Sequence, residues 1–204
     1  MFVFELAMDV SIDQQIASLK TIHPGWYCLV VIVREYLRKI GGVLVGVKEK
    51  WGGLRFEANG DDRVSWVCML AEAISFRMCN KCGGFGKLCV QQDNQLTFCT
   101  GCAGLNGYVA LQNAEEATKT GTPSSNGFVE ATKACPGFLI VAATTSTEVR
   151  KAGGTITKFE IQNGRLRSNW DCKGDQQAKD RVKALCLFAN ELSSRISPTT
   201  GKPL

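Results

Sequence analysis

The second half of this 204-residue chain repeats the turn residues of the first half. Three short segments recur 112 positions later and in the same order: residues 135–138 match 23–26, residues 150–154 match 38–42, and residues 164–167 match 52–55. After six extra residues the match resumes at an offset of 118, where residues 180–182 repeat 62–64. Repeated turn residues with apolar positions kept between them indicate an internal duplication. The sequence therefore predicts two related units in tandem.

Apolar spacing predicts the elements of the first copy. Residues 11–22 and 26–40 carry apolar side chains at helical intervals, which indicates two amphipathic helices. Two short strands, 43–47 and 54–56, are expected to form a hairpin. A further helix begins after Asp61, a residue type that commonly caps helices. The repeated part of the first copy is thus helix, hairpin, helix.

The duplication also settles the elements of the second copy. Residues 138–147 are rich in β-branched side chains and resemble a strand when taken alone, but their counterpart in the first copy is helical, so we predict a helix. Strands 155–161 and 165–170 flank Asn163-Gly164, a strong hairpin signal, and a last helix covers 176–196. The predicted fold class is α+β, a tandem duplication of an αββα unit.

Four cysteines form two Cys-x2-Cys pairs that are separated by sixteen residues. This spacing is typical of a zinc ribbon, in which two turns each present two thiolates to one tetrahedral ion. The predicted ligands of this single Zn²⁺ are Cys79, Cys82, Cys99 and Cys102. Four protein ligands leave no position for water or substrate, so the site is predicted to be structural.

The second copy lacks these ligands. Ser197 and Thr200 stand where the first copy has Cys79 and Cys82, and a hydroxyl does not replace a thiolate, so we expect no second zinc. The predicted organisation is a first repeat over 1–102 with the ribbon at 79–102, a Gly-, Ser- and Thr-rich linker over 103–134, and a degenerate, metal-free second repeat over 135–204.

Composition indicates the compartment. The first residues have no basic region, as a signal peptide would, and the longest other apolar run, 28–33, is too short to cross a bilayer. Three of the six remaining cysteines, Cys28, Cys68 and Cys186, lie in apolar segments, and all six suit a reducing environment. We expect a soluble, cytoplasmic protein without a membrane partner.

One segment resembles a known family. Residues 47–56, Val-Lys-Glu-Lys-Trp-Gly-Gly-Leu-Arg-Phe, lie between a helix opened by Pro-Gly-Trp and a helix that ends in Cys-x2-Cys-Gly. This arrangement resembles an uncharacterised family of small bacterial and phage proteins with a Lys-Glu-Lys-Phe-Gly-Gly-Leu-Arg-Phe signature followed by a cysteine ribbon. The similarity covers about residues 22–102; Trp51 replaces the usual phenylalanine, and Glu57 stands where an aromatic residue is common. The resemblance implies a prophage or mobile-element setting and carries over no catalytic residue.

The sequence favours a non-enzyme. His23 is the only histidine, and a histidine before Pro-Gly at a helix start is usually a capping or packing residue. The first hairpin carries Lys48, Lys50 and Arg55, which could hold a phosphate, although alternating charges on a hairpin are more often a solvated face. Phosphate-loop, nucleophile-elbow and paired-carboxylate motifs do not occur in the sequence.

Two binding functions remain. The net charge is +1 over the first 102 residues and +4 over the remainder, and the candidate basic residues of the second copy are Arg150, Lys151, Arg165 and Arg167. Such a surface would attract nucleic acid. The other hypothesis, which the phage-like setting favours, is an accessory protein that binds a host protein, for example to inhibit a defence or regulatory system. We expect the surface that the two units share or divide to carry the function.

Overall fold

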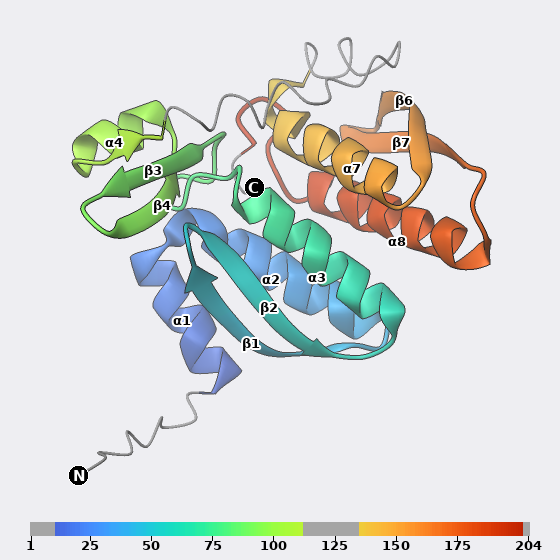
Figure 1. The fold of residues 1–204 in the computed structure, drawn as a ribbon, viewed down its shortest axis with the longest axis horizontal. Coiled ribbons are helices and arrows are strands. Elements are labelled where there is room, and N and C mark those ends of the chain that lie inside the picture. The colour runs from blue at the N-terminus through green and yellow to red at the C-terminus, as the bar shows by residue number, and fades with distance from the viewer. Residues whose placement is uncertain (1–10, 112–134, 202–204) are drawn as a thin grey trace.

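The computed structural model describes residues 11–111 and 135–201 and is an α+β protein of helices and small antiparallel sheets (Figure 1). Its first part contains α1 (Ile12–Ile22), α2 (Pro24–Lys39), β1 (Val43–Lys50), β2 (Gly53–Asn59), α3 (Asp62–Ser75), β3 (Lys87–Gln91), β4 (Asn94–Phe98), α4 (Thr100–Leu105) and β5 (Val109–Ala110). Its second part contains the 3-10 helix η2 (Pro136–Phe138), α7 (Leu139–Lys151), β6 (Gly154–Gln162), β7 (Arg165–Cys172) and α8 (Gln176–Ser193). Within the described ranges, no helix combines the length and apolarity needed to cross a membrane.

The first helix–hairpin–helix unit consists of α2, β1, β2 and α3, and its predicted elements are confirmed. Pro24 is the first residue of α2, where its missing N–H leaves no bond unmade. Asp61 caps α3 by accepting a hydrogen bond of 3.0 Å from the backbone N–H of Arg63. The preceding helix α1 packs beside β1, where the side chain of Gln15 accepts a bond from the N–H of Val47 at 2.9 Å.

The second unit consists of η2, α7, β6, β7 and α8, and its elements also lie where the sequence predicts them. The segment rich in β-branched residues is the helix α7, whose Val141 and Val149 are fully buried. Asn163 and Gly164 form the hairpin tip in the left-handed region, with φ of 51° and 71°. The predicted choice of helix over strand is therefore confirmed, because the apolar side chains of α7 face the core.

The two hairpins have the same register. Strand pairing shifts between Leu44 and Gly46 in the first and between Ile156 and Lys158 in the second, which are positions 112 residues apart. The pairs that close the tips, Lys50–Gly53 and Gln162–Arg165, correspond in the same way. Most of the extra residues of the second unit lengthen its last helix, which has 18 residues in α8 against 14 in α3.

The two units pack through their helices. Each hairpin is a separate two-stranded sheet, and Figure 1 shows α2, α3, α7 and α8 lying between the two hairpins. One continuous apolar core includes residues of both units, and the rings of Tyr36 and Phe188 meet across the contact with centroids 5.3 Å apart. Two ion pairs at the rim join the units, Lys39–Glu191 at 2.7 Å and Glu35–Arg195 at 3.0 Å. The described chain is thus one body with a helical interior.

The ribbon, residues 79–111, extends the first unit. It contains a three-stranded sheet in the order β4-β3-β5, so the ordered segment continues past Cys102 into the stretch expected as a linker. Residues 112–134, the rest of that expected linker, lie outside the described residues. The ribbon docks on the first hairpin, where the hydroxyl of Thr97 donates to the carbonyl of Gly52 at 2.7 Å.

Candidate metal centre and surrounding surfaces

The structure brings the four predicted ligand cysteines together. Their sulfur atoms all lie within 4.8 Å of one another, and the Sγ atoms of Cys82 and Cys99 are 3.7 Å apart. Ligand sulfurs at the corners of a tetrahedron with metal–sulfur bonds of about 2.3 Å are separated by about 3.8 Å. The donor set and its spacing therefore suit a thiophilic metal ion held at four corners.

Two backbone turns present these sulfurs. The first comes after α3, where the N–H of Gly83 donates to the carbonyl of Cys79 at 2.9 Å. The second is the start of α4, where Cys99 is the N-cap and its sulfur accepts a bond from the N–H of Cys102 at 3.4 Å. The buried side chain of Asn80 ties the turns together by donating to the carbonyl of Thr97 at 2.6 Å. The sulfurs are thus positioned by the backbone on both sides.

The electrostatics of the cluster favour a cation. Burial raises the pKa of Cys99, but hydrogen bonds from the backbone of Cys102 and from neighbouring thiols outweigh it and bring this pKa to about 7. Burial also raises the pKa of Cys82 and of Cys102. Four thiolates at this spacing repel one another, and a dication placed among them removes that repulsion. The site is suited to stabilising a fold, because all four corners are taken by protein.

The second unit keeps the first turn without its thiols. The N–H of Gly201 donates to the carbonyl of Ser197 at 2.8 Å, which repeats the bond between Gly83 and Cys79. Both turns also receive a bond from the start of their own unit, from Gly25 to Asn80 and from Gly137 to Pro198, each 2.7 Å long. The turn is therefore stable without a metal ligand at Ser197.

Glycine is required where these turns are contacted. A Cβ atom on Gly25 would overlap the backbone of Cys79 and Gly83, and one on Gly137 would overlap the backbone of Ser197 and Gly201. The repeated Pro-Gly dipeptide was the sequence signal for this contact, although spacing alone did not say what the glycine touches.

His23 lies beside the first turn. Its Nδ1 is 3.3 Å from the side-chain oxygen of Asn80, and its ring packs on that of Trp26 with centroids 5.0 Å apart. Burial lowers its pKa below the usual value, partly offset by the hydrogen bond to Asn80 and the charge of Glu49. The imidazole is therefore neutral at pH 7 and supports the turn.

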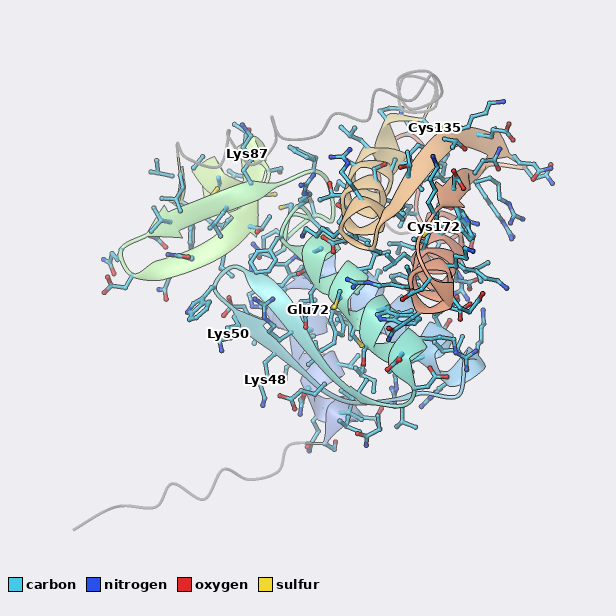
Figure 2. The ribbon with its side chains drawn as sticks, turned by 45° about the vertical axis from the view of Figure 1, so that its right-hand side comes forward. Lys48, Lys50, Glu72, Lys87, Cys135 and Cys172 are labelled. Atoms are coloured by element: carbon cyan, nitrogen blue, oxygen red, sulfur yellow. The ribbon has the colours of Figure 1, made fainter. Side chains whose placement is uncertain are left out.

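The basic residues of the first hairpin have partners in the same chain. Lys48 pairs with Glu57 at 3.0 Å, and the ammonium of Lys50 lies 4.9 Å from the ring centre of Trp51. Figure 2 shows Lys48 and Lys50 on the outer side of this hairpin, and Glu72 on α3 beneath it. The guanidinium of Arg55 lies 3.5 Å from Glu72 and stacks on the ring of Phe76. The three cations do not form a common pocket.

The basic residues of the second unit lie at opposite ends of its hairpin. Arg150 and Lys151 end α7 near the base, and Lys151 pairs with Glu148 at 2.8 Å. Arg165 begins β7 at the tip, and Arg167 lies two residues further along. The nine residues of β6 separate base from tip, a length of roughly 26 Å. These positive charges are therefore dispersed along the hairpin.

Sequence reasoning missed an apolar surface around the ribbon. The three most exposed large apolar side chains among the described residues are Leu105 at 89%, Trp51 at 69% and Val109 at 69%. A cavity of about 350 Å³ is lined by Val109 and by Cys99 of the metal cluster, and its walls are mainly apolar groups that include Phe85, Phe98 and Tyr108. No periodic pattern predicted these exposed residues, because they come from the tip of the first hairpin, the end of α4 and the start of β5.

Two further cavities are present in the described residues. One, of about 400 Å³, lies where the first hairpin meets the ribbon and is lined by His23, Glu49, Trp51, Asp93, Asn94, Gln95, Leu96 and Tyr108. The other, of about 760 Å³, lies between α3 and α8, where Trp66 and Leu187 contribute apolar walls among charged side chains.

Comparison with known proteins gives no further guide: no protein family, no curated protein and no solved structure matches this chain.

Proposed function

We propose that this protein is a non-enzymatic accessory protein that binds another protein through the ribbon face, defined as the exposed surface formed by Trp51, Leu105 and Val109 and the adjoining cavities. The observation that carries the proposal is that the three most exposed large apolar side chains of the described residues all belong to the ribbon or to the hairpin tip on which the ribbon docks. Contiguous exposed apolar groups commonly mark protein-binding sites, and aromatic residues are frequent among the residues that contribute most to binding.

In this proposal the ribbon holds one structural Zn²⁺. A set of four thiolates at tetrahedral spacing favours zinc among common cellular ions, and it leaves no coordination position for a substrate. The role of the ion is to order the ribbon, which is too small to form a large core: its buried residues outside the main core are Cys79, Cys89, Phe98 and Ala103.

We also propose that the two units arose by duplication. The shared element order, the equal hairpin registers and the paired glycine contacts support a common origin. The second unit then contributes its helices to the joint core, while the first unit carries the ribbon face. We therefore assign the function to the ribbon face, which belongs to the first unit only.

The non-enzymatic assignment is supported by how the candidate groups are used. His23 contacts Asn80 and Trp26, and Arg55 is held by Glu72, so both groups have packing or ion-pair partners within the chain. Because residues 47–56 resemble a signature of small bacterial and phage proteins, we propose that the partner belongs to a bacterial host, in a defence or regulatory system. A nucleic acid is the alternative partner, and the dispersed charges of the second unit support it less well than the ribbon face supports protein binding.

Affinity capture with paired surface variants tests the proposal. We expect a host protein that is captured stoichiometrically by the wild type to be lost with Leu105→Ser/Val109→Thr and retained with Val43→Thr, because Val43 is an exposed valine at the far end of the first hairpin. Equal capture by both variants would refute the assignment of protein binding to the ribbon face. Binding to duplex DNA that falls steeply with salt and is lost with Arg165→Gln/Arg167→Gln would instead support the nucleic-acid alternative.

A further inference from the structure

We propose that the cavity between the first hairpin and the ribbon, here the junction pocket, binds an arginine side chain of the partner protein. The inference rests on the proposed protein-binding function and specifies which group is recognised. The pocket has a volume of about 400 Å³ and combines three aromatic rings, His23, Trp51 and Tyr108, with the carboxylates of Glu49 and Asp93. Rings and carboxylates together are the environment that a guanidinium prefers.

One side of the junction pocket is held by contacts between the hairpin tip and the ribbon. Gly52 and Leu96 form a bridge between the hairpin tip and the ribbon, and Thr97 bonds to the carbonyl of Gly52. Tyr108 packs on the buried ring of Phe98 with centroids 4.6 Å apart. A preformed pocket loses little conformational entropy on binding, which favours affinity.

Trp51 is not explained by the requirements of the fold. Its φ of 53° lies in the left-handed region, which bulky side chains rarely adopt, and 69% of its surface is exposed. The corresponding residue of the other hairpin is Asn163, with φ of 51°, a residue type that tolerates this conformation. A tryptophan therefore costs stability at this turn, and ligand contact accounts for its presence.

The ring of Trp51 already attracts a cation. The ammonium of Lys50 lies 4.9 Å from the ring centre, at the distance typical of a cation–π contact. Arginine stacks on aromatic rings more readily than lysine does, because its guanidinium is planar and less strongly hydrated. An arginine in the junction pocket would therefore compete well for this ring.

The charge of the pocket selects a cation. Glu49 and Asp93 supply two carboxylates, and none of the lining residues is a lysine or an arginine. The N–H of Gly52 donates to Glu49 Oε1 at 2.8 Å and orients this carboxylate. Burial lowers the pKa of His23, so its neutral ring leaves the negative charge in place at pH 7.

The junction pocket adjoins the apolar part of the ribbon face. Tyr108 lines both this pocket and the cavity lined by Val109 and Cys99. A partner segment with apolar residues next to an arginine would fill both cavities at once. This combination, an arginine beside apolar anchors, is common at the centre of protein interfaces.

Nuclear magnetic resonance with small probes tests the inference. We expect N-acetyl-arginine methylamide to shift the indole N–H signal of Trp51 saturably, with a dissociation constant on the order of 1 mM. The neutral isostere N-acetyl-citrulline methylamide should bind at least tenfold more weakly, because it lacks the charge. Equal binding of the two probes, or tighter binding of the lysine analogue, would overturn the assignment.

Matched variants locate the probe and separate the two proposals. Glu49→Gln, which keeps the bond from Gly52, and Asp93→Asn should each weaken binding of the arginine probe at least fivefold, whereas Glu57→Gln on the same hairpin should not change it. Trp51→Asn should fold normally, and the probe should then no longer shift the signals of Tyr108, which lines the same pocket. If protein capture is lost with Leu105→Ser/Val109→Thr but survives Glu49→Gln/Asp93→Asn, this inference alone is refuted. If the arginine probe binds but no protein is captured, the proposed function alone is refuted.

Discussion

The turn at residues 79–83 and the turn at residues 197–201 have the same backbone and different side chains. Both close with a glycine N–H bonded to the first carbonyl, and both are contacted by a glycine from the start of the unit. Only the first presents thiols to the metal cluster. The difference indicates that the turn belongs to the helix–hairpin–helix unit, whereas the thiols belong to the ribbon that only the first unit carries among the described residues. The comparison can be tested by removing the metal ligand, the glycine, or the bonds that both units share.

Loss of a metal ligand should have the largest effect on stability, and this effect should be confined to the ribbon of the first unit. The binding free energy of a structural zinc ion, on the order of 10 kcal/mol, is also folding free energy for the segment that it orders. We expect Cys79→Ser to lose its metal and to exchange amide hydrogens in β3 and β4 at least 100-fold faster, as an order-of-magnitude estimate. Metal content and hydrogen exchange by mass spectrometry provide the measurement.

The matched control for this experiment is Cys89→Ala. Cys89 is buried in the ribbon, but it is not one of the four clustered cysteines. This variant should retain one metal ion per chain. If Cys79→Ser also exposes α7 and α8 to exchange, the second unit depends on the ribbon and the comparison fails.

Substitution of the two contact glycines should destabilise both units. Gly25→Ala and Gly137→Ala each place a Cβ atom against backbone that cannot move aside easily, and we expect each to cost about 3 kcal/mol of unfolding free energy. Chemical denaturation measures this loss. Gly104→Ala is the control, because nothing lies within 4 Å of its Cβ position in α4, and it should be neutral or stabilising by up to about 1 kcal/mol. A tolerated Gly137→Ala would mean that the second turn is not held in the same way as the first.

Removal of a serine hydroxyl that occurs at the same place in both units should cause a smaller loss of unfolding free energy. This loss should be equal in the two units. Ser75 accepts a bond from the N–H of Leu54 at 2.8 Å, and Ser193 accepts one from Leu166 at 3.0 Å. Ser75→Ala and Ser193→Ala each leave a buried N–H without its partner, which costs about 1–3 kcal/mol. The exposed Ser65→Ala is the reference for a neutral change in α3. Thermal unfolding measures the loss of stability in each variant. Clearly different losses for Ser75→Ala and Ser193→Ala would show that the two units are not energetically equivalent at this position.

The ion pairs between the units should matter least. Lys39→Gln and Arg195→Gln remove partly exposed pairs that are screened by solvent, and we expect each to cost about 0.5 kcal/mol or less. The cost should vanish in high salt. A loss well above 1 kcal/mol, measured by denaturation at low and high salt, would show that charge rather than the shared apolar core joins the units.

The sequence predicted the elements better than it predicted their surfaces. The helix α7 was recoverable because its turn residues match those of α2, although its own β-branched side chains favour a strand. The cysteine cluster was recoverable because metal geometry fixes ligand spacing. Both predictions rest on a pattern that is local or periodic along the chain.

The surfaces depend on contacts between segments that no pattern links. Arg55 pairs with Glu72 between the hairpin and α3, a contact that the alternating charges of the hairpin sequence did not predict. The junction pocket exists only because Thr97 of the ribbon bonds to Gly52 of the hairpin tip. The short elements α4 and β5 were missed because six and two residues carry too little periodicity to identify.

The bonds from Gly25 to Asn80 and from Gly137 to Pro198 have a mechanical consequence. In each unit the chain that enters and the chain that leaves are joined side by side by a backbone hydrogen bond. Tension applied along the chain therefore passes across this joint before it reaches the hairpin or the helices.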